Sequence, residues 1–321
     1  MENISFGKID VLFRMWKCGV NMLKLPIDDH AVRLLFEKKP RHLEVDFLYR
    51  EIANRMYEKL SLIKLNPKYV LDLGCGTGAD LLKLGAHFKE ATVVGLDGAY
   101  TRIAEAKYRY QKSLSWLEKW RGRWGSTLRG PRFISGDMMQ LPIATQSVEM
   151  IWSNLALHWC STPQSLLAEW KRVLKPEGLF MFACFGPDTC REIKKAFLEI
   201  DEAEHVLPFI DMHDWGDMLV EAGFSTPVMD MEVVTVTYSS KEQLFKELRA
   251  MGGNPLLHRR RGLMGRHAWD KVLKKLGELC DEEGKTPLTF EIVYGHAFRP
   301  ISRVTKNGDA IVHFQPKLTG I

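Results

Sequence analysis

Short apolar runs alternate with longer mixed stretches over the middle of the chain, and this pattern predicts alternating strands and helices. Beginning at Tyr69, the runs read YVLDLG, ATVVGLD, FISGD, VEMIWSN and GLFMFACFG. They are too short for helices and apolar enough for strands that are buried on both faces. Strands separated by helices imply right-handed βαβ units, so we expect an α/β fold with a mostly parallel sheet and helices on both of its faces.

The segments on either side of these strands favour helices. Residues 1–66 look helical, and the stretch FLYREIANRMYEKLSLI places its apolar residues near one face: Phe47, Ile52, Met56, Leu60 and Ile63. After the fifth strand, residues 188–204 and the stretch FIDMHDWGDMLVEAGF predict two more helices. Gly223 stands where the C-cap of the second of these helices is expected.

Two late segments, PVMDMEVVTVTY and TFEIVYGHAF, alternate as strands should, and the helical stretches KEQLFKELRAMGG and GRHAWDKVLKKLGELCDEEG lie between them. Late strands of this kind can form the antiparallel edge of an otherwise parallel sheet. We therefore predict an N-terminal helical extension or lid over residues 1–66 and a main domain over 67–300. The main domain would carry a helical insertion at about 239–285, and a C-terminal tail would follow over 301–321.

The connection from Tyr108 to Pro131 is longer than a simple crossover needs. It combines three tryptophans with several cations: Trp116, Trp120, Trp124, Lys112, Lys119, Arg121, Arg123 and Arg129. The spacing of the tryptophans favours an amphipathic helix that buries them and leaves the cations in solvent. The alternative interpretation is a surface for a partner.

Composition restricts the class of protein. With 321 residues of which 45% are hydrophobic, the chain can fill a substantial core, which excludes a disordered or fibrous class. The six cysteines are scattered without zinc spacing, so we expect no disulfide and no structural metal. No apolar run approaches the roughly 20 residues that span a bilayer, and no cleavable leader is evident. We therefore expect a cytoplasmic monomer without a membrane partner.

Net charge points to the kind of partner. A formal charge of +5 is below the usual excess of a nucleic-acid binder, so we expect no nucleic acid. The same charge would suit an acidic partner if it were concentrated on one face.

The stretch VLDLGCGTGAD contains the first candidate site. Gly74, Gly76 and Gly78 follow a predicted strand and would let the chain approach a ligand closely. Taken alone, this loop also satisfies a loose dinucleotide-binding pattern. However, Asp72 lies inside the strand, where it would repel a pyrophosphate and attract a sulfonium and an α-ammonium group. The loop therefore favours a positively charged ligand.

Acidic residues end the next two predicted strands as well. Asp97 stands at about the separation from the glycine loop at which an acid meets a ribose in nucleotide-binding folds. Asp137 could bind an adenine amino group, and Met138 could cover the ring. Each acid alone is more often a cap or a turn former. Three acids at successive strand ends lie where open α/β sheets bind ligands.

This constellation resembles the class I S-adenosylmethionine-dependent methyltransferases over at least residues 65–185, on the motifs DLGCGTG and LKPEG. The resemblance implies a Rossmann-like, seven-stranded sheet whose last strand is antiparallel, with S-adenosyl-L-methionine as cofactor and S-adenosyl-L-homocysteine as product. It implies cofactor contacts by the following residues: Asp72, Gly74, Cys75, Gly76, Gly78, Asp97, Gly98, Asp137, Met138 and Asn154.

Further phrases are similar to the malonyl-acyl-carrier-protein O-methyltransferases of biotin synthesis: WSNLALHWC, FGPDTCREI, FIDMHDWGDMLVEAGF, RRRGLMGR and FEIVYGHAF. The resemblance runs from about Asp29 to Pro300. It implies that the enzyme caps the free carboxylate of a malonyl thioester, carried by acyl carrier protein or coenzyme A, as a methyl ester. Members of the family commonly have a Tyr-Asp pair in the N-terminal lid. This chain has His42 and Leu43 there, so either another residue such as Tyr49 makes the contact or the acceptor differs.

The chemistry of a carboxylate acceptor asks for little acid-base help. A carboxylate is already ionised and nucleophilic at neutral pH, so no general base is needed. Catalysis would come from holding an oxygen in line with the methyl group and excluding water. Asn154, His158 and Trp159 follow the fourth strand, and we assign Asn154 to cofactor or acceptor positioning. His158 and Trp159 form either the acceptor wall or simply a packed helix start.

The densest cationic segment contains Arg259, Arg260 and Arg261, followed by Arg266. It could be a solvated turn between two helices. Alternatively, these arginines meet the acidic surface of an acyl carrier protein, or one of them orients the malonyl group.

Three other functions share much of this pattern. The chain could be a methyltransferase for a small acid or a natural product, or a relative of the assembly factors that hydroxylate a protein arginine. It could also be a non-catalytic binding module, although the intact acids and glycines argue against a degenerate site. Fold alone does not separate these options.

Overall fold

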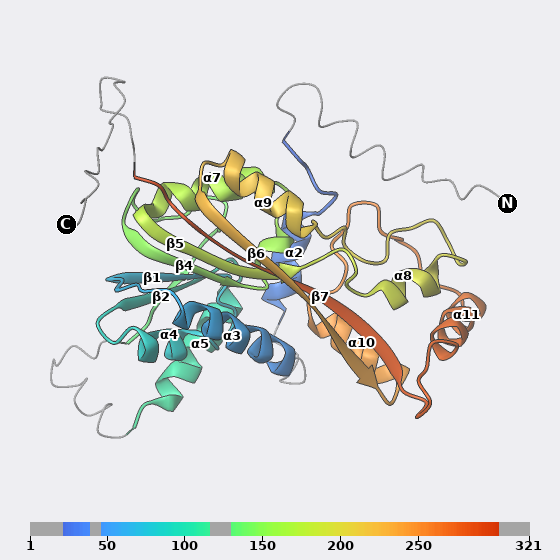
Figure 1. The fold of residues 1–321 in the computed structure, drawn as a ribbon. Helices are drawn as coiled ribbons and strands as arrows, with labels where there is room; N and C mark the ends of the chain where they lie inside the picture. Colours follow the sequence, from blue (N-terminus) through green and yellow to red (C-terminus); the bar gives the residue numbers. More distant parts are fainter. Residues whose placement is uncertain (1–21, 39–45, 116–129, 302–321) are drawn as a thin grey trace, which may run out of the picture.

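The computed structural model describes residues 22–38, 46–115 and 130–301. They contain one seven-stranded sheet with the strand order β3-β2-β1-β4-β5-β7-β6 (Figure 1). Strands β1 to β5 are parallel, and β7 runs antiparallel to both β5 and β6. The predicted Rossmann-like sheet with an antiparallel last strand is therefore confirmed. The strands are β1 (Tyr69–Leu73), β2 (Thr92–Asp97), β3 (Arg132–Ser135), β4 (Val148–Asn154), β5 (Leu174–Phe185), β6 (Ser225–Tyr238) and β7 (Thr286–Phe298).

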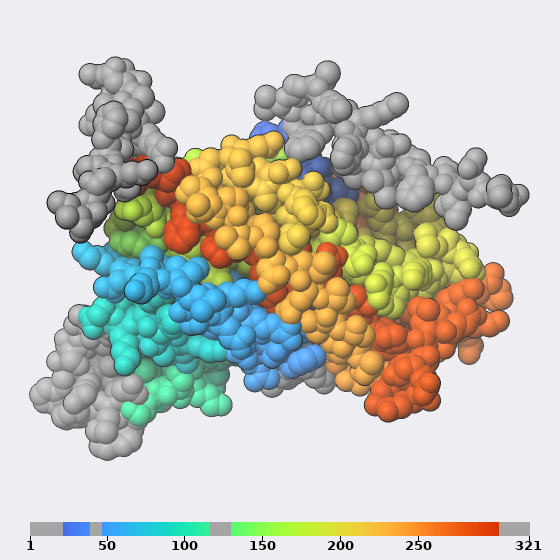
Figure 2. Space-filling view, viewed as in Figure 1, coloured from blue at the N-terminus to red at the C-terminus, as the bar shows by residue number. Residues whose placement is uncertain are grey.

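Helices cover both faces of the sheet. One face carries α3 (Asp46–Ser61), α4 (Leu81–His87) and α5 (Tyr100–Ser113), and the other carries α7 (Pro163–Val173) and α9 (Met212–Glu221) (Figure 1). Beside the long β6–β7 pair lie α8 (Arg191–Phe197), α10 (Lys241–Ala250) and α11 (Arg266–Gly277). In the space-filling view, α11 forms the outer edge of the molecule at this end (Figure 2). The other two described helices are α2 (Asp29–Glu37) and the short 3₁₀ helix η1 (Leu157–Trp159).

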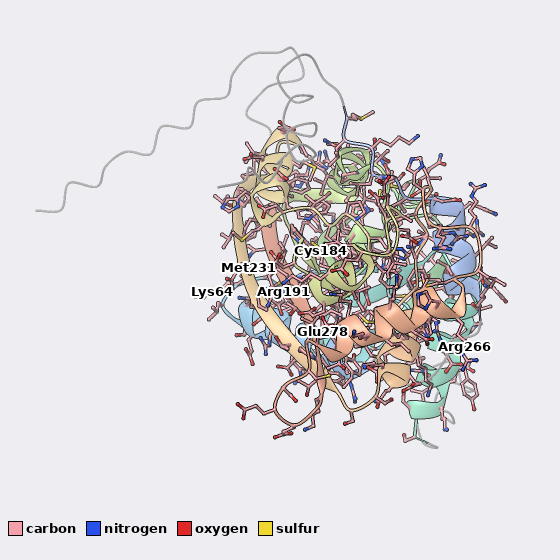
Figure 3. The ribbon with its side chains drawn as sticks, turned by 90° about the vertical axis from the view of Figure 1, so that its right-hand side faces the viewer. Lys64, Cys184, Arg191, Met231, Arg266 and Glu278 are labelled. Carbon is pink, nitrogen blue, oxygen red and sulfur yellow. The ribbon has the colours of Figure 1, made fainter. Side chains whose placement is uncertain are left out.

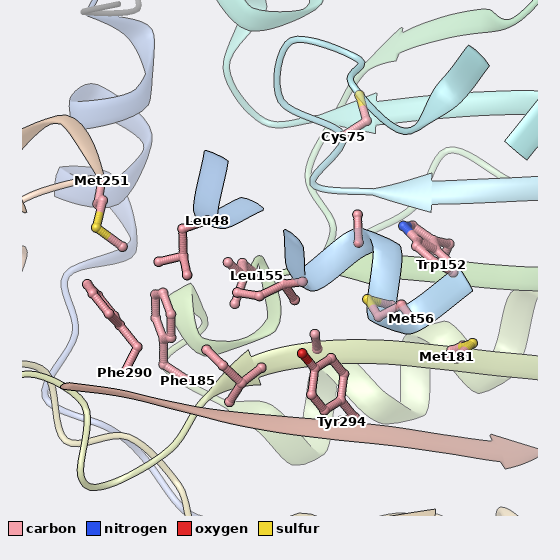
Figure 4. Packing of buried hydrophobic residues seen from close by; sticks show 14 of the residues in the cluster. Leu48, Met56, Cys75, Trp152, Leu155, Met181, Phe185, Met251, Phe290 and Tyr294 are labelled. Carbon is pink, nitrogen blue, oxygen red and sulfur yellow. The ribbon is translucent and has the colours of Figure 1, made fainter. Parts of the chain in front are cut away.

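The core has two layers because the central strands are apolar on both faces. In β5, Phe180 and Phe182 pack towards α7 and α9, whereas Met181 and Phe185 pack towards the α3 side. On that side, Met56 of α3 belongs to the same buried cluster as Trp152 and Met181 (Figure 4). This alternation is what the continuous apolar runs predicted.

Helix α3 is fixed to the sheet by apolar and charged contacts. Its apolar face is buried at Leu48, Ile52, Met56 and Leu60, but Phe47, which the sequence placed on that face, is half exposed. On its outer side, the helix makes ion pairs from Arg55 to Glu232 and from Lys59 to Asp230 of β6. The hydroxyl of Tyr294 in β7 donates to the same Glu232 carboxylate. A helix near the start of the chain therefore depends on the last two strands.

Two elements differ from the predicted pattern. The helix expected over 188–204 is only α8, because the chain turns after Phe197 and the Asp201 carboxylate accepts a bond from the Ala203 backbone N–H. Strand β5 already begins at Leu174, so the LKPEG motif lies inside the strand rather than before it. The C-cap residue of α9 is Ala222, and Gly223 follows it with a φ of 74°, the left-handed conformation that commonly ends a helix.

Several predicted features lie outside the described residues. These are the tryptophan-rich segment from Trp116 to Arg129, the lid residues His42 and Leu43, and the C-terminal tail beyond Ile301. Within the described ranges, no helix has both the length and the apolar character that crossing a membrane requires.

Candidate active site

A cavity of about 1340 Å³ lies where the loops after β1, β2, β3 and β4 meet. This is the position at the carboxyl ends of parallel strands where open α/β sheets bind ligands. Helix α2 closes one side of the cavity with Asp29, Val32, Arg33 and Phe36. The cavity therefore has a wall of sheet loops and a facing wall from the N-terminal part of the chain.

Helix α2 is anchored at both ends across this cavity. At its start, the Asp29 carboxylate accepts bonds from the backbone and hydroxyl of Ser161, just after η1. At its end, Glu37 accepts bonds from the backbone N–H groups of Tyr100 (2.8 Å) and Thr101 (3.1 Å) at the start of α5. Burial alone would raise the pKa of the Glu37 carboxyl, but these two donors hold it below its usual value. The helix is thus a fixed wall of the site.

The glycine loop after β1 forms the floor of the cavity. Gly74, Gly76 and Gly78 all have positive φ values, of 73°, 52° and 78°. A Cβ at Gly74 would lie 2.2 Å from the Cβ of Ala156, whereas a Cβ at Gly76 would meet no protein atom within 4 Å. Gly74 is therefore required for packing, and Gly76 borders open space in the cavity. Gly78 does not line the cavity but packs against Ala106 of α5.

Asp72 and Asp80 put two carboxylates close to this loop. Asp72 is buried, and its Oδ2 has no hydrogen-bond partner among the described residues. Asp80, which the sequence analysis did not select, lines the cavity and accepts bonds from Trp152 Nε1 (3.1 Å) and Asn154 Nδ2 (3.3 Å). Burial raises the pKa of both carboxyls, and the charge of Asp80 raises that of Asp72 further. Together they form an anionic pocket that fits a cationic group.

Asp97 links the glycine loop to the end of β2. Its Oδ2 accepts a bond from the backbone N–H of Gly76 (2.9 Å), and its Oδ1 accepts one from Ala99 (2.8 Å). Burial raises the pKa of the Asp97 carboxyl, while these two donors oppose the shift. A carboxylate offers about four acceptor positions, so Asp97 can also accept bonds from a ligand hydroxyl.

The end of β3 supplies the far side of the cavity. Asp137 accepts a bond from the backbone N–H of Met139 (2.8 Å), and both Asp137 and Met138 line the cavity. Gly98 and Cys75 line it as well. The structure thus brings together every residue that was assigned to the cofactor except Gly78.

The end of β4 and the residues after it supply another part of the cavity wall. Asn154 lines the cavity, donates to the Tyr49 carbonyl oxygen at 3.1 Å, and has an Oδ1 without a partner among the described residues. Tyr49 and Trp159 line the cavity too, and Trp159 packs edge-to-face on Phe36 of α2 with ring centroids 5.1 Å apart. These side chains can position an acceptor.

His158 does not line the cavity, so its assignment to the acceptor wall is not supported. Its ring is buried against Phe185 and Phe209 behind the wall. Burial lowers the pKa of His158 to about 3, which leaves the imidazole neutral. His158 is therefore part of a packed helix start, which was the alternative interpretation, because η1 turns its side chain into the core.

The predicted arginines lie away from this cavity. Arg259, Arg260 and Arg261 border a second cavity of about 780 Å³, so none of them orients an acceptor in the first one. Arg266 is exposed at the start of α11 and lines neither cavity (Figure 3). The cations that line the first cavity from the N-terminal side are Arg33 and Arg50, which the sequence analysis did not single out.

Comparison with known proteins agrees with this geometry. Residues 71–182 match the family described as "Methyltransferase domain". The malonyl-[acyl-carrier protein] O-methyltransferase of Gallionella capsiferriformans is 41% identical over 91% of this chain and 98% of its own length. The protein of the same name from Laribacter hongkongensis is 43% identical over 90% of this chain and 96% of its own length. Among solved structures, the YcgJ protein of Bacillus subtilis has a TM-score of 0.54 at 14% identity and shares the fold, covering 78% of this chain and all of its own.

The residues around the cavity fit S-adenosylmethionine, the cofactor of this enzyme class. An unpartnered buried carboxylate at Asp72 and the adjacent Asp80 suit its positively charged groups. The open space above Gly76 admits its close approach, and Asp97 can accept bonds from its ribose. The protein is therefore a methyltransferase that uses S-adenosylmethionine.

Proposed function

The chain belongs to the family of malonyl-[acyl-carrier protein] O-methyltransferases, and we propose that it methylates the free carboxylate of malonyl-[acyl-carrier protein] in biotin synthesis. The observation that carries this proposal is identity of 41–43% with relatives of that name over nearly their whole length. Such a reaction hides a negative charge as a methyl ester, so that enzymes of chain elongation can accept the product.

On the cofactor side, S-adenosylmethionine supplies an electrophilic methyl group on a positively charged sulfur. Asp72 and Asp80 provide the negative charge that holds its cationic end. The Asp97 carboxylate, fixed by Gly76 and Ala99, orients the ribose, and Asp137 with Met138 receives the adenine. These roles follow from the chemistry of the cavity wall.

On the acceptor side, the protein must hold a carboxylate close to the methyl group. Arg33 and Arg50 are the cations on the N-terminal wall, and either can offset the charge of the malonyl group. Asn154 and Tyr49 lie beside the acidic pair, and Trp159 with Phe36 excludes water from that side. No proton has to leave the acceptor, so positioning and desolvation account for the chemistry without a general base.

The direct test is incubation with S-adenosylmethionine and malonyl-[acyl-carrier protein], followed by mass spectrometry. We expect the mass of the acylated carrier to increase by one methyl group in place of a proton. Acetyl-[acyl-carrier protein], which has no free carboxylate, is the control and should not change. If neither malonyl-[acyl-carrier protein] nor malonyl-coenzyme A is methylated, the proposal is wrong.

The carrier protein is the proposed physiological acceptor, and coenzyme A is the alternative. A comparison of kcat/KM for the two malonyl thioesters decides between them. We also propose that the enzyme works as a cytoplasmic monomer, which light scattering of the purified protein and fractionation of cells would test.

A further inference from the structure

A second cavity, of about 780 Å³, lies between the start of α2, the end of α8 and the first turns of α11. Its charged lining is unbalanced. Arg259, Arg260 and Arg261 border it, and Asp28 is the carboxylate among its lining residues. Asp28 is already engaged, because it caps α2 by accepting a bond from the Ala31 backbone N–H at 3.0 Å. The cavity therefore favours an anion.

Two of the arginines are held in place by neighbouring groups. Arg260 donates to Asp201 Oδ2 at 2.8 Å, and the other oxygen of Asp201 lies 2.7 Å from His205 Nε2. Arg259 donates to the Asn254 carbonyl oxygen at 2.8 Å. A guanidinium has five N–H donors, so each of these arginines keeps donors for a ligand. Within the described part of the chain, neither Arg259 nor Arg261 forms an ion pair. No carboxylate there neutralises their positive charge, which can therefore attract an anionic ligand.

Most of the other residues that border the cavity have apolar side chains. Phe197 at the end of α8 stacks on the His205 ring with centroids 3.8 Å apart, and Leu256, Met264 and Trp269 also border the cavity. An anion joined to an aliphatic chain would satisfy both parts of such a site.

The second cavity shares its walls with the active-site cavity. Helix α2 separates them, with Val32 and Phe36 facing the first cavity and Ala31 facing the second. The end of α10 and the segment after it also border the two cavities, since Ala250 lines the first cavity and residues 254–257 line the second.

Backbone contacts keep the two cavities in a fixed relation. Ile27 forms an isolated antiparallel bridge with Leu256, and the Asp28 N–H donates to the Pro255 carbonyl oxygen at 3.0 Å. In the same segment, a Cβ at Gly252 would lie 2.6 Å from the Trp159 ring, so the segment packs closely on the acceptor wall.

We propose that the second cavity binds the phosphate ester of the pantetheine arm that carries the malonyl group. This inference rests on the proposed function, since it requires a phosphopantetheine thioester as acceptor. The backbone of pantetheine has about the length of four residues, roughly 14 Å when extended. An α-helix with its side chains is about 10–12 Å across. The malonyl group adds about the length of one more residue, so the acylated arm spans roughly 17 Å. Half the circumference of such a helix is roughly 16–19 Å. An arm held by its phosphate beside Arg259 and Arg261 can therefore reach around α2 to the active-site cavity.

The test compares two acceptors that differ only in the phosphate, malonyl-pantetheine and malonyl-phosphopantetheine. The double variant Arg259→Gln/Arg261→Gln removes two charges and leaves the Arg260–Asp201 pair intact. We expect kcat/KM for the phosphorylated acceptor to fall roughly 10- to 100-fold, as for lost charge-assisted hydrogen bonds. The value for malonyl-pantetheine should be unchanged. Arg266→Gln, which removes a nearby exposed charge that lines neither cavity, is the matched control and should leave both values unchanged.

The other outcomes overturn the inference in distinguishable ways. An equal loss on both acceptors places the effect in the fold or the active site, and no loss on either leaves the arginines without a ligand. A loss confined to malonyl-[acyl-carrier protein], with malonyl-phosphopantetheine unaffected, means that the arginines contact the carrier protein. If the unmodified enzyme methylates no malonyl thioester, the proposed function fails. Calorimetric titration with phosphopantetheine then decides on the site, since binding that the double variant lacks supports it and no binding overturns it.

Discussion

Asp72 and Asp80 illustrate how a ligand site can oppose the stability of the fold. Each carboxyl has a pKa above its usual value, mainly because it is buried. A raised pKa means that the folded protein binds protons more tightly than the unfolded chain. Their contribution to stability is therefore greatest at low pH and is lost as pH rises through the raised pKa. At neutral pH, a bound cation offsets this cost.

Replacing Asp80 with Asn should separate stability from binding. Asn keeps an oxygen that can accept the bond from Trp152 Nε1, but it removes one of two neighbouring charges. We expect the free energy of unfolding of the cofactor-free protein at pH 8 to rise by on the order of 1 kcal/mol. We expect its affinity for S-adenosylmethionine to fall roughly tenfold or more. Urea unfolding and calorimetric titration measure the two effects, and a variant that is weaker in both would contradict this account.

His158 should affect stability rather than the chemical step. The folded protein keeps its pKa at about 3, whereas the unfolded chain has the ordinary value near 6.5. Between these values the unfolded state binds the extra proton, so stability falls as pH decreases. His158→Phe should remove this dependence. The free energy of unfolding of the variant minus that of the unmodified protein should therefore be about 2–3 kcal/mol larger at pH 4.5 than at pH 7.5. Urea titrations of both proteins at the two pH values test this, and a constant difference would show that His158 does not titrate as described.

Among the elements, the glycine loop has one position that serves packing and another that serves the ligand. Gly74→Ala brings its Cβ into Ala156 in a left-handed backbone, and should lower the free energy of unfolding by about 2–4 kcal/mol. Gly76→Ala meets no protein atom and should lower it by only about 1 kcal/mol. The Gly76 variant should nevertheless lose roughly tenfold or more in affinity for S-adenosylhomocysteine, about 1.4 kcal/mol. Equal affinity for Gly76→Ala and the unmodified protein would exclude close approach at this position.

Helix α2 depends on Glu37, which joins its end to the start of α5. Glu37→Ala removes two bonds to backbone N–H groups and should loosen this wall of the cavity. We expect a several-fold faster dissociation of S-adenosylhomocysteine, consistent with roughly 1 kcal/mol for lost bonds. Glu58→Ala, on the exposed side of α3, is the matched control. Stopped-flow fluorescence measures both rates, and the same rate in Glu37→Ala as in the control would show that α2 does not limit release.

The elements of the sheet could be predicted from sequence because each apolar run is local. The same is true of Asp72, Asp97 and Asp137, which lie at the end of a strand or within two residues of it. Asp80 could not be selected in this way, since in the sequence it is an ordinary residue before a helix. Its role depends on Trp152 and Asn154, which donate to it from β4. Arg33 was also missed, because only the position of α2 across the sheet brings it to the cavity.

At the scale of the whole molecule, the sequence shows that Arg259, Arg260 and Arg261 lie far along the chain from the glycine loop, but it does not determine how far apart the fold places them. The structure places them in two cavities on either side of α2. A cationic segment could be recognised from composition, whereas its place at the border of a cavity follows from the packing of α2, α8 and α11. Which anion such a segment meets depends on this tertiary arrangement and not on charge alone.

The strand order also determines when the fold can be completed during synthesis. The last strand, β7, lies between β5 and β6, so β6 has no partner in the sheet until β7 has been made. About fifty residues separate Tyr238 from Thr286, which at roughly 5–20 residues per second corresponds to a delay of roughly 2–10 s. The nascent chain therefore leaves the ribosome with β6 unpaired, and the sheet does not yet hold Glu232 and Asp230 of β6 against Arg55 and Lys59. Ribosome-bound chains that stop at residue 285 should be cleaved by protease within β6, and equal protection of these and full-length chains would contradict this order of folding.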